Sequence, residues 1–131
     1  MLKEVLINDE IGEFLVEKIN LTQTQLDTLL ITLLNNDKSN LNKMISRRDN
    51  RKVSKGSFIR TLKQAKKNVE SSLFTLIILE YFSIIEENQI NNLIKIGNTL
   101  KNISDNVSAD KDINIILDHV SSTISSVCNK K

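Results

Sequence analysis

Apolar residues recur along this chain at the spacing of amphipathic helices and not at the strict alternation of strands. The clearest stripe lies within residues 23–34, where Leu26, Leu29, Leu30, Leu33 and Leu34 share one helical face. Similar stripes predict further helices near residues 9–19, 39–48, 55–69, 87–104 and 108–128. We therefore predict an all-α fold, a single helical domain over residues 1–131 with about six helices.

Helix-start signals support this division of the chain. Thr22 and Gln25 have the spacing of a capping box, in which each side chain accepts a hydrogen bond from the other residue's backbone N–H. Ser39, Ser54 and Ser108 each stand where a side-chain oxygen would cap one of the later helices. The chain has no proline and three glycines, so it is poor in the residues on which hairpin turns depend.

The helix that begins near Lys55 leaves one question open. Its buried face is predicted to carry Phe58, Leu62, Ala65 and Val69. The apolar stretch Leu73–Ile85 follows, and either the helix continues into it or Ser71-Ser72 interrupts the helix. Apolar positions surround the axis of this stretch, which predicts burial at the centre of the domain. The stretch is shorter than the about 20 residues that a membrane span needs, so no membrane partner is expected.

Charge is segregated along the chain. The 18 basic and 16 acidic residues give a net charge of only +2. Residues 38–67, called here the basic stretch, nevertheless hold eleven Lys and Arg and a single acid, Asp49. The remainder of the chain is correspondingly acidic. Solvated helical surfaces normally mix both signs, so this separation indicates a polyanionic partner.

The basic stretch has the pattern of a helix-turn-helix within residues 39–70. Two helices are joined by a polar turn, and the second helix is capped and basic. Opposite its apolar face lie side chains suited to base edges and phosphates. The residues predicted to contact nucleic acid are Arg47, Arg48, Arg51, Lys52, Lys55, Ser57, Arg60, Lys63, Gln64 and Lys67. No aromatic residue lies on this face, which favours duplex over single-stranded nucleic acid; RNA stays an alternative to DNA.

A family resemblance points the same way. The segments Arg47-Arg48-Asp49, Val53–Phe58 and Arg60–Ala65, followed by Asn68, resemble small archaeal helix-turn-helix DNA-binding proteins. More distantly, they resemble the helix-turn-helix of sigma-factor-type regulators. The resemblance covers about residues 41–85. It implies a transcriptional regulator or chromatin-associated protein in an archaeal cytoplasm.

Enzyme chemistry has little support in this sequence. His119 is the only histidine and Cys128 the only cysteine, and neither has a neighbouring partner that suggests catalysis or metal binding. We expect no enzyme activity, no cofactor and no metal. A single cysteine excludes an intramolecular disulfide, and the first residues lack the apolar core of a signal peptide, so we expect a cytoplasmic protein.

Two further interpretations stay open. The chain is alternatively a helical protein-interaction adaptor whose basic face binds an acidic partner. The apolar stripes of the two C-terminal helices, within residues 87–128, either complete the core of the monomer or form the seam of a homodimer.

Overall fold

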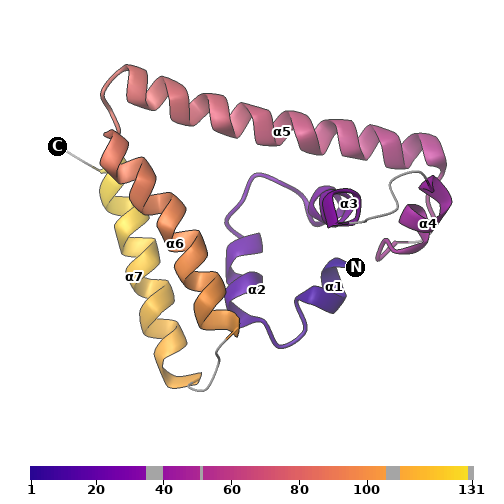
Figure 1. The fold of residues 1–131 in the computed structure, drawn as a ribbon, viewed down its shortest axis with the longest axis horizontal. Coiled ribbons are helices and arrows are strands. Elements are labelled where there is room, and N and C mark those ends of the chain that lie inside the picture. Colours follow the sequence, from indigo (N-terminus) through magenta and orange to yellow (C-terminus); the bar gives the residue numbers. More distant parts are fainter. Residues whose placement is uncertain (35–39, 51, 106–109, 130–131) are drawn as a thin grey trace. The chain divides into compact units, whose positions relative to one another are not determined.

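The computed structural model describes residues 1–34, 40–50, 52–105 and 110–129, and in residues 105 and 110–112 it describes only the backbone. Across these residues the fold is all-helical, with seven helices and no strand (Figure 1). The helices are α1 (Leu2–Val5), α2 (Glu10–Val16), α3 (Gln23–Leu34), α4 (Leu41–Ser46), α5 (Lys55–Tyr81), α6 (Glu87–Asp105) and α7 (Asp110–Cys128). The all-α prediction is confirmed.

The chain divides into two compact units, Met1–Ser72 and Leu73–Lys131. Helix α5 continues without a break across this division, so residues 73–81 of the apolar stretch are a direct extension of the helix that begins at Lys55. The alternative of an interruption at Ser71-Ser72 is therefore excluded. That residues 1–131 form a single domain stays a prediction.

Local capping explains where the helices of the first unit begin. The Thr22 N–H donates to Gln25 Oε1 at 3.0 Å and the Gln25 N–H donates to Thr22 Oγ1 at 3.1 Å, which confirms the capping box. Ser54 Oγ accepts from the Ser57 N–H at 3.1 Å and caps α5 as predicted. Helix α4 is capped by Asn40, whose Oδ1 accepts from the Lys43 N–H at 3.1 Å. Ser39 and Ser108, the other predicted caps, lie outside the described residues.

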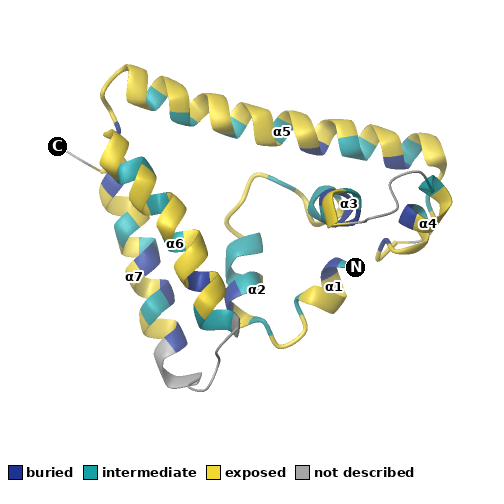
Figure 2. Cartoon of the chain, in the orientation of Figure 1, coloured by how far each residue is buried: buried dark blue, intermediate teal, exposed yellow. Residues whose placement is uncertain are grey.

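The core of the first unit joins three helices. Ile31 of α3, Met44 of α4 and Phe58 of α5 are buried together. Met1, Leu41 and Ile45 pack against them, partly buried. Figure 2 shows the buried positions on α3, α4 and the N-terminal part of α5. Phe58 is fully buried and therefore fixes the orientation of the first turns of α5.

The second unit is built around the antiparallel neighbours α6 and α7, which lie side by side (Figure 1). Their stripes supply its buried apolar residues: Leu100 from α6, and Ile113, Leu117, Val120 and Val127 from α7. Part of each stripe thus completes the core of the unit. A homodimer through these helices stays a prediction.

The burial predicted for the apolar stretch after Ser72 is wrong. Phe74 is 70% exposed, and Leu73, Ile77, Ile78, Tyr81, Phe82 and Ile84 are also exposed. In this stretch only Ile85 is buried. The physical reason is that, apart from Ile85, α6 and α7 provide the buried apolar residues of this unit between themselves, so most of the apolar circumference of α5 is left uncovered.

Gly97 offers a test of the packing of α6. It lies in the helix interior, its φ is negative, and a Cβ added there would meet no atom within 4 Å. Gly97→Ala is therefore expected to stabilise the protein by about 1 kcal/mol, because glycine is a poor helix former. Chemical denaturation would measure this gain. Destabilisation would instead show that a neighbouring chain approaches α6 at Gly97, as a dimer seam requires.

Candidate nucleic-acid interface

The N-terminal part of α5 is held by one face. Phe58 and Ala65 are fully buried and Leu62 is half-buried, as predicted. Val69, also predicted to be buried, is 37% exposed. Polar bonds replace apolar contacts at this level of the helix: Asn68 Nδ2 donates to Gln25 Oε1 at 3.1 Å, and Ser72 Oγ donates to Asn20 Oδ1 at 3.3 Å.

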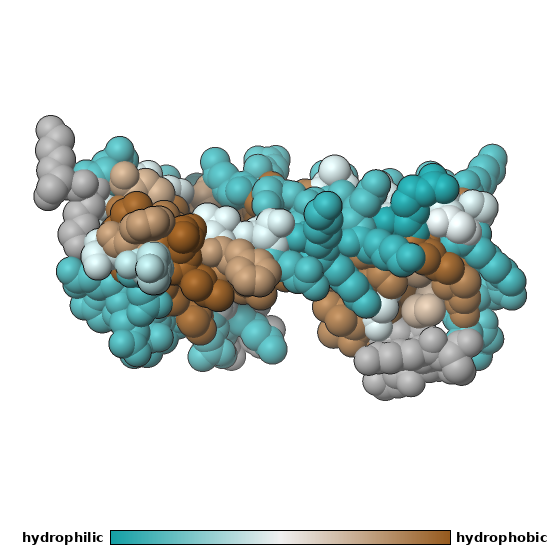
Figure 3. Space-filling model, turned by 90° about the horizontal axis from the view of Figure 1, so that it is seen from above, coloured by the Kyte–Doolittle hydropathy of each residue, from teal (hydrophilic) through white to brown (hydrophobic). Residues whose placement is uncertain are grey.

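The opposite face of α5 carries the predicted cations. Arg60, Lys63 and Lys67 are exposed, and at 100° per residue they fall within about 60° of arc opposite Phe58. Gln64 is exposed and Ser57 half-buried at one flank of this arc. We call Arg60, Lys63 and Lys67 the cationic face of α5. In Figure 3, which views α5 from its outer side, hydrophilic side chains cover this part of the helix, and hydrophobic ones gather towards its C-terminal end.

Two further predicted contacts lie at the start of the same helix. Lys52 and Lys55 are exposed, and Lys55 is the first residue of α5. Cations at a helix N-terminus add to the positive end of the helix dipole, so both strengthen the attraction for anions there. Arg51 lies outside the described residues.

The arginines that follow α4 do not behave alike. Arg47 is exposed, as predicted, and it forms the C-cap of α4. Arg48, predicted to point outward, is only 3% exposed, so this prediction is wrong. Its guanidinium lies over the Phe58 ring, with Cζ 5.8 Å from the ring centroid. The chain turns inward here because the next residue, Asp49, is bonded through its N–H to Asp27 on α3.

The turn after α4 is anchored by the amino terminus. The Met1 ammonium donates to the Arg47 carbonyl oxygen and to Asp49 Oδ1, both at 2.7 Å, and lies 3.4 Å from Asp27 Oδ1. Buried Asp27 also accepts from the Leu2 N–H at 2.8 Å and, through Oδ2, from the Asp49 N–H at 2.9 Å. Sequence reasoning missed this network, although Asp49 had a signal: it is the single acid of the basic stretch.

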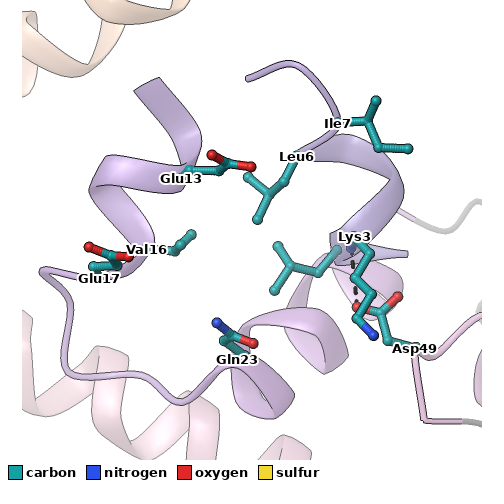
Figure 4. Close-up of a pocket in the computed structure, with 9 residues that line it drawn as sticks. Lys3, Leu6, Ile7, Glu13, Val16, Glu17, Gln23 and Asp49 are labelled. Atoms are coloured by element: carbon teal, nitrogen blue, oxygen red, sulfur yellow. Dashed lines mark hydrogen bonds between the residues drawn. The ribbon is translucent and has the colours of Figure 1, made fainter. Parts of the chain in front are cut away.

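A pocket borders this network. It has a volume of about 350 Å³ and is lined by residues of α1 and α2, by Gln23 and by Asp49. Figure 4 shows Leu6 and Val16 among its apolar lining, with Glu13 and Glu17 on α2 and at its end. The Lys3 N–H donates to Asp49 Oδ2 at 3.1 Å at its edge (Figure 4). Arg60, Lys63 and Lys67 do not line this pocket, so it is separate from the cationic face of α5.

The anchored ammonium predicts a pH dependence. Burial lowers the pKa of the Met1 ammonium, but the hydrogen bond to Asp49 and the charge of Asp27 outweigh burial and raise that pKa above 8.0. A raised folded-state pKa stabilises the fold below the unfolded pKa, so this contribution is lost as the pH rises above about 8. The midpoint temperature of thermal unfolding of the 131-residue chain should therefore decrease as the pH is raised from neutral to mildly alkaline values.

Asp49, which pairs with this ammonium, predicts a second pH dependence on the acidic side, and its substitution provides the control. Burial raises the pKa of Asp49, but bonds from the Met1 ammonium and the Lys3 N–H lower it below 3.8 overall. Its contribution is therefore present above about pH 4 and is lost as the pH falls through the lowered pKa. Asp49→Asn should flatten both limbs of the stability profile. An unchanged alkaline limb in this variant would contradict the role assigned to the pair.

Other candidate chemistry finds no assembled site in the described part of the chain. No group of three or more His, Cys, Asp or Glu side chains there is placed to hold a metal ion. His119 and Cys128 are both exposed on α7. None of the helices in the described ranges is both long enough and apolar enough to span a membrane. That the chain is not an enzyme stays a prediction.

Comparisons with protein-family models, with curated proteins and with solved structures found no match to this chain.

Proposed function

We propose that this protein binds duplex nucleic acid through the cationic face of α5, and that the duplex is DNA. The observation that carries the proposal is the two-sided character of the helix. Phe58 and Ala65 bury one side, while Arg60, Lys63 and Lys67 project together from the other. The helix therefore presents its charges on a fixed surface, and an α-helix fits the major groove of B-form DNA.

Each part of this surface has a chemical role in the proposal. Lys63, Lys67, Lys52 and Lys55 contact phosphates, which positions the helix without reading sequence. Arg60 and Gln64 are the candidates for base contacts, because arginine pairs bidentately with guanine and glutamine with adenine. Arg47 contacts backbone beside the groove. Arg48 is left out of this surface, because its guanidinium is buried.

Helices α4 and α5 correspond to the two helices of the predicted helix-turn-helix. Their connection, residues 47–54, is longer than the roughly three- to four-residue turn of that motif. The proposal therefore rests on the exposed face of α5 and not on the geometry of the motif. A transcriptional regulator or a chromatin-associated protein is the biological role in which such a surface is used.

A duplex titration at two salt concentrations tests the proposal. Counterion release makes phosphate-dominated binding weaken steeply with salt, so we expect binding at about 50 mM salt and a loss of at least tenfold in affinity by about 200 mM. A duplex RNA of the same sequence in competition would decide between DNA and RNA. No binding to either duplex at the lower salt concentration would overturn the proposal.

One observation favours a second function, an adaptor that binds an acidic protein. Along the outer arc of α5 the cations give way to exposed Phe74, Ile78 and Tyr81. A partner with neighbouring acidic and apolar patches would match this succession, whereas a duplex would use only the basic part. The double variant Phe74→Ser, Tyr81→Ser should bind duplex with unchanged affinity. The adaptor function would be favoured if the unmodified protein captured an acidic protein in the presence of nuclease and the double variant did not.

A further inference from the structure

A second, polar cavity lies beside the turn that precedes α5, on the inner side of the basic stretch. Its volume is about 190 Å³. Lys3, the first residues of α3 (Gln23 and Thr24), Arg48 and the carboxylates Asp27 and Asp49 line it. None of the residues of the cationic face of α5 contributes to this lining, so the cavity is separate from the proposed duplex surface.

Arg48 is the unexplained group in this cavity. The residue is 97% buried, being 3% exposed, and its Nε and Nη1 atoms are buried without a hydrogen-bond partner among the residues that the structure describes. Buried polar atoms are nearly always hydrogen-bonded, and the requirement is stronger for a charged group. The Phe58 ring covers one face of the guanidinium but accepts no conventional hydrogen bond. The described surroundings of Arg48 therefore lack an acceptor for these two atoms.

The neighbouring carboxylates do not supply that acceptor. Asp27 accepts from the Leu2 and Asp49 N–H groups, and Asp49 accepts from the Met1 ammonium and the Lys3 N–H. Among the described residues, the ion pairs of both carboxylates are made with the Met1 ammonium, and neither pairs with Arg48. The charged residues of the lining are two cations, Lys3 and Arg48, and two carboxylates. The Met1 ammonium lies outside the lining but pairs with both carboxylates, so the group as a whole has one excess positive charge.

The start of α3 adds anion-binding capacity to the lining. The capping box satisfies the N–H groups of Thr22 and Gln25, and the Leu26 N–H donates to the Thr22 carbonyl. The N–H groups of Gln23 and Thr24, in the first turn, are those that an α-helix leaves without an acceptor within the helix. A helix of this length also carries a partial positive charge at its N-terminus.

We propose that this cavity is a binding site for a small tetrahedral oxyanion of the phosphate class. The anion accepts hydrogen bonds from the Arg48 guanidinium, whose planar fork of donors suits phosphate oxygens, and it is attracted by the Lys3 ammonium and the first turn of α3. The space is sufficient, because one water occupies about 30 Å³ and the cavity is several times larger. Binding satisfies the buried donors of Arg48 and neutralises the excess charge.

A titration of the unmodified protein with inorganic phosphate tests the site directly. Phosphorus NMR should show saturable binding, and the thermal midpoint should rise with phosphate but not with chloride at equal ionic strength, because a ligand that binds only the folded state stabilises it. Lys3→Ala, an exposed substitution, should weaken phosphate binding about two- to fivefold, the contribution typical of an exposed charge pair. Lys95→Ala, an exposed substitution on α6 outside both the cavity lining and the cationic face of α5, is the matched control and should leave phosphate binding unchanged.

The Arg48 variants complete the test. Arg48→Met keeps the long side chain over Phe58 but removes every donor, so it should abolish the phosphate response. Arg48→Lys should retain a weaker response and guards against a variant that fails to fold. Absence of saturable binding in the unmodified protein, or an undiminished response in folded Arg48→Met, would overturn the proposal.

The source of the phosphate is decided by a duplex titration of Arg48→Met. Unchanged duplex affinity, together with a lost phosphate response, assigns the site to a free oxyanion. A loss of both assigns it to a phosphate of the nucleic acid. This inference is independent of the proposed function: a protein that binds phosphate at Arg48 but no duplex would retain the oxyanion site and lose only the nucleic-acid proposal.

Discussion

The triple variant Arg60→Ala, Lys63→Ala, Lys67→Ala is expected to bind duplex DNA with a flatter salt dependence. Each phosphate contact contributes about 0.9 to the slope of log affinity against log salt, so the loss of the two phosphate contacts proposed for Lys63 and Lys67 should reduce the slope by about 1.8. Between about 50 and 200 mM salt, the affinity of the variant should fall about 12-fold less than that of the unmodified protein. Fluorescence anisotropy over a salt series measures both slopes.

The fold should survive this substitution. All three side chains are exposed, and alanine is the strongest helix former, so α5 itself is not weakened. Circular dichroism of the variant should therefore match that of the unmodified protein. A reduced slope with unchanged helix content assigns the effect to lost phosphate contacts and not to unfolding.

A control variant separates local contacts from overall charge. Lys18→Ala, Lys95→Ala and Lys101→Ala remove the same three charges from exposed positions outside the basic stretch. This variant should keep the salt slope of the unmodified protein. If the two triple variants behaved alike, the net charge of the chain and not the cationic face of α5 would govern binding.

Features fixed by a few neighbouring residues could be predicted from the sequence. The capping box of Thr22 and Gln25 involves residues three apart, and so does the bond from the Ser57 N–H to Ser54. Such bonds need no tertiary structure, and the 3.6-residue period then locates the helix that follows. The exposed positions of Arg60, Lys63 and Lys67 follow from the same period once the burial of Phe58 is assumed.

Features that depend on distant residues could not be predicted. Arg48 turns inward because the adjoining residue Asp49 is held by Asp27, which lies 22 positions away, and by Met1, 48 positions away. Helix α1 has four residues, too few to display a helical period. The exposure of Phe74 and Tyr81 shows a third limit. An apolar stretch predicts that its side chains are buried, but it does not indicate which element packs against them.

Phe58→Ala is expected to cost about 3–5 kcal/mol of stability, because it removes a fully buried aromatic ring from a packed core. Small domains are stable by about 5–15 kcal/mol, so this loss is a large share of the total. The ring contacts the cluster of Ile31 and Met44 and lies under the guanidinium of Arg48. Its loss leaves a cavity between α3, α4 and α5, where the basic helix is attached to its unit.

Phe74→Ala is the matched control, since it makes the same chemical change on the same helix at a side chain that is 70% exposed. Surface substitutions usually change stability by less than about 0.5 kcal/mol, so urea denaturation followed by circular dichroism should separate the two variants clearly. Equal stabilities would contradict the assignment of Phe58 as the attachment of α5.

At temperatures where Phe58→Ala remains folded, its duplex affinity should be retained, because the ring lies on the opposite side of the helix from Arg60, Lys63 and Lys67. A variant that is folded but no longer binds would instead show that the cationic face acts only when α5 is held rigidly against α3 and α4.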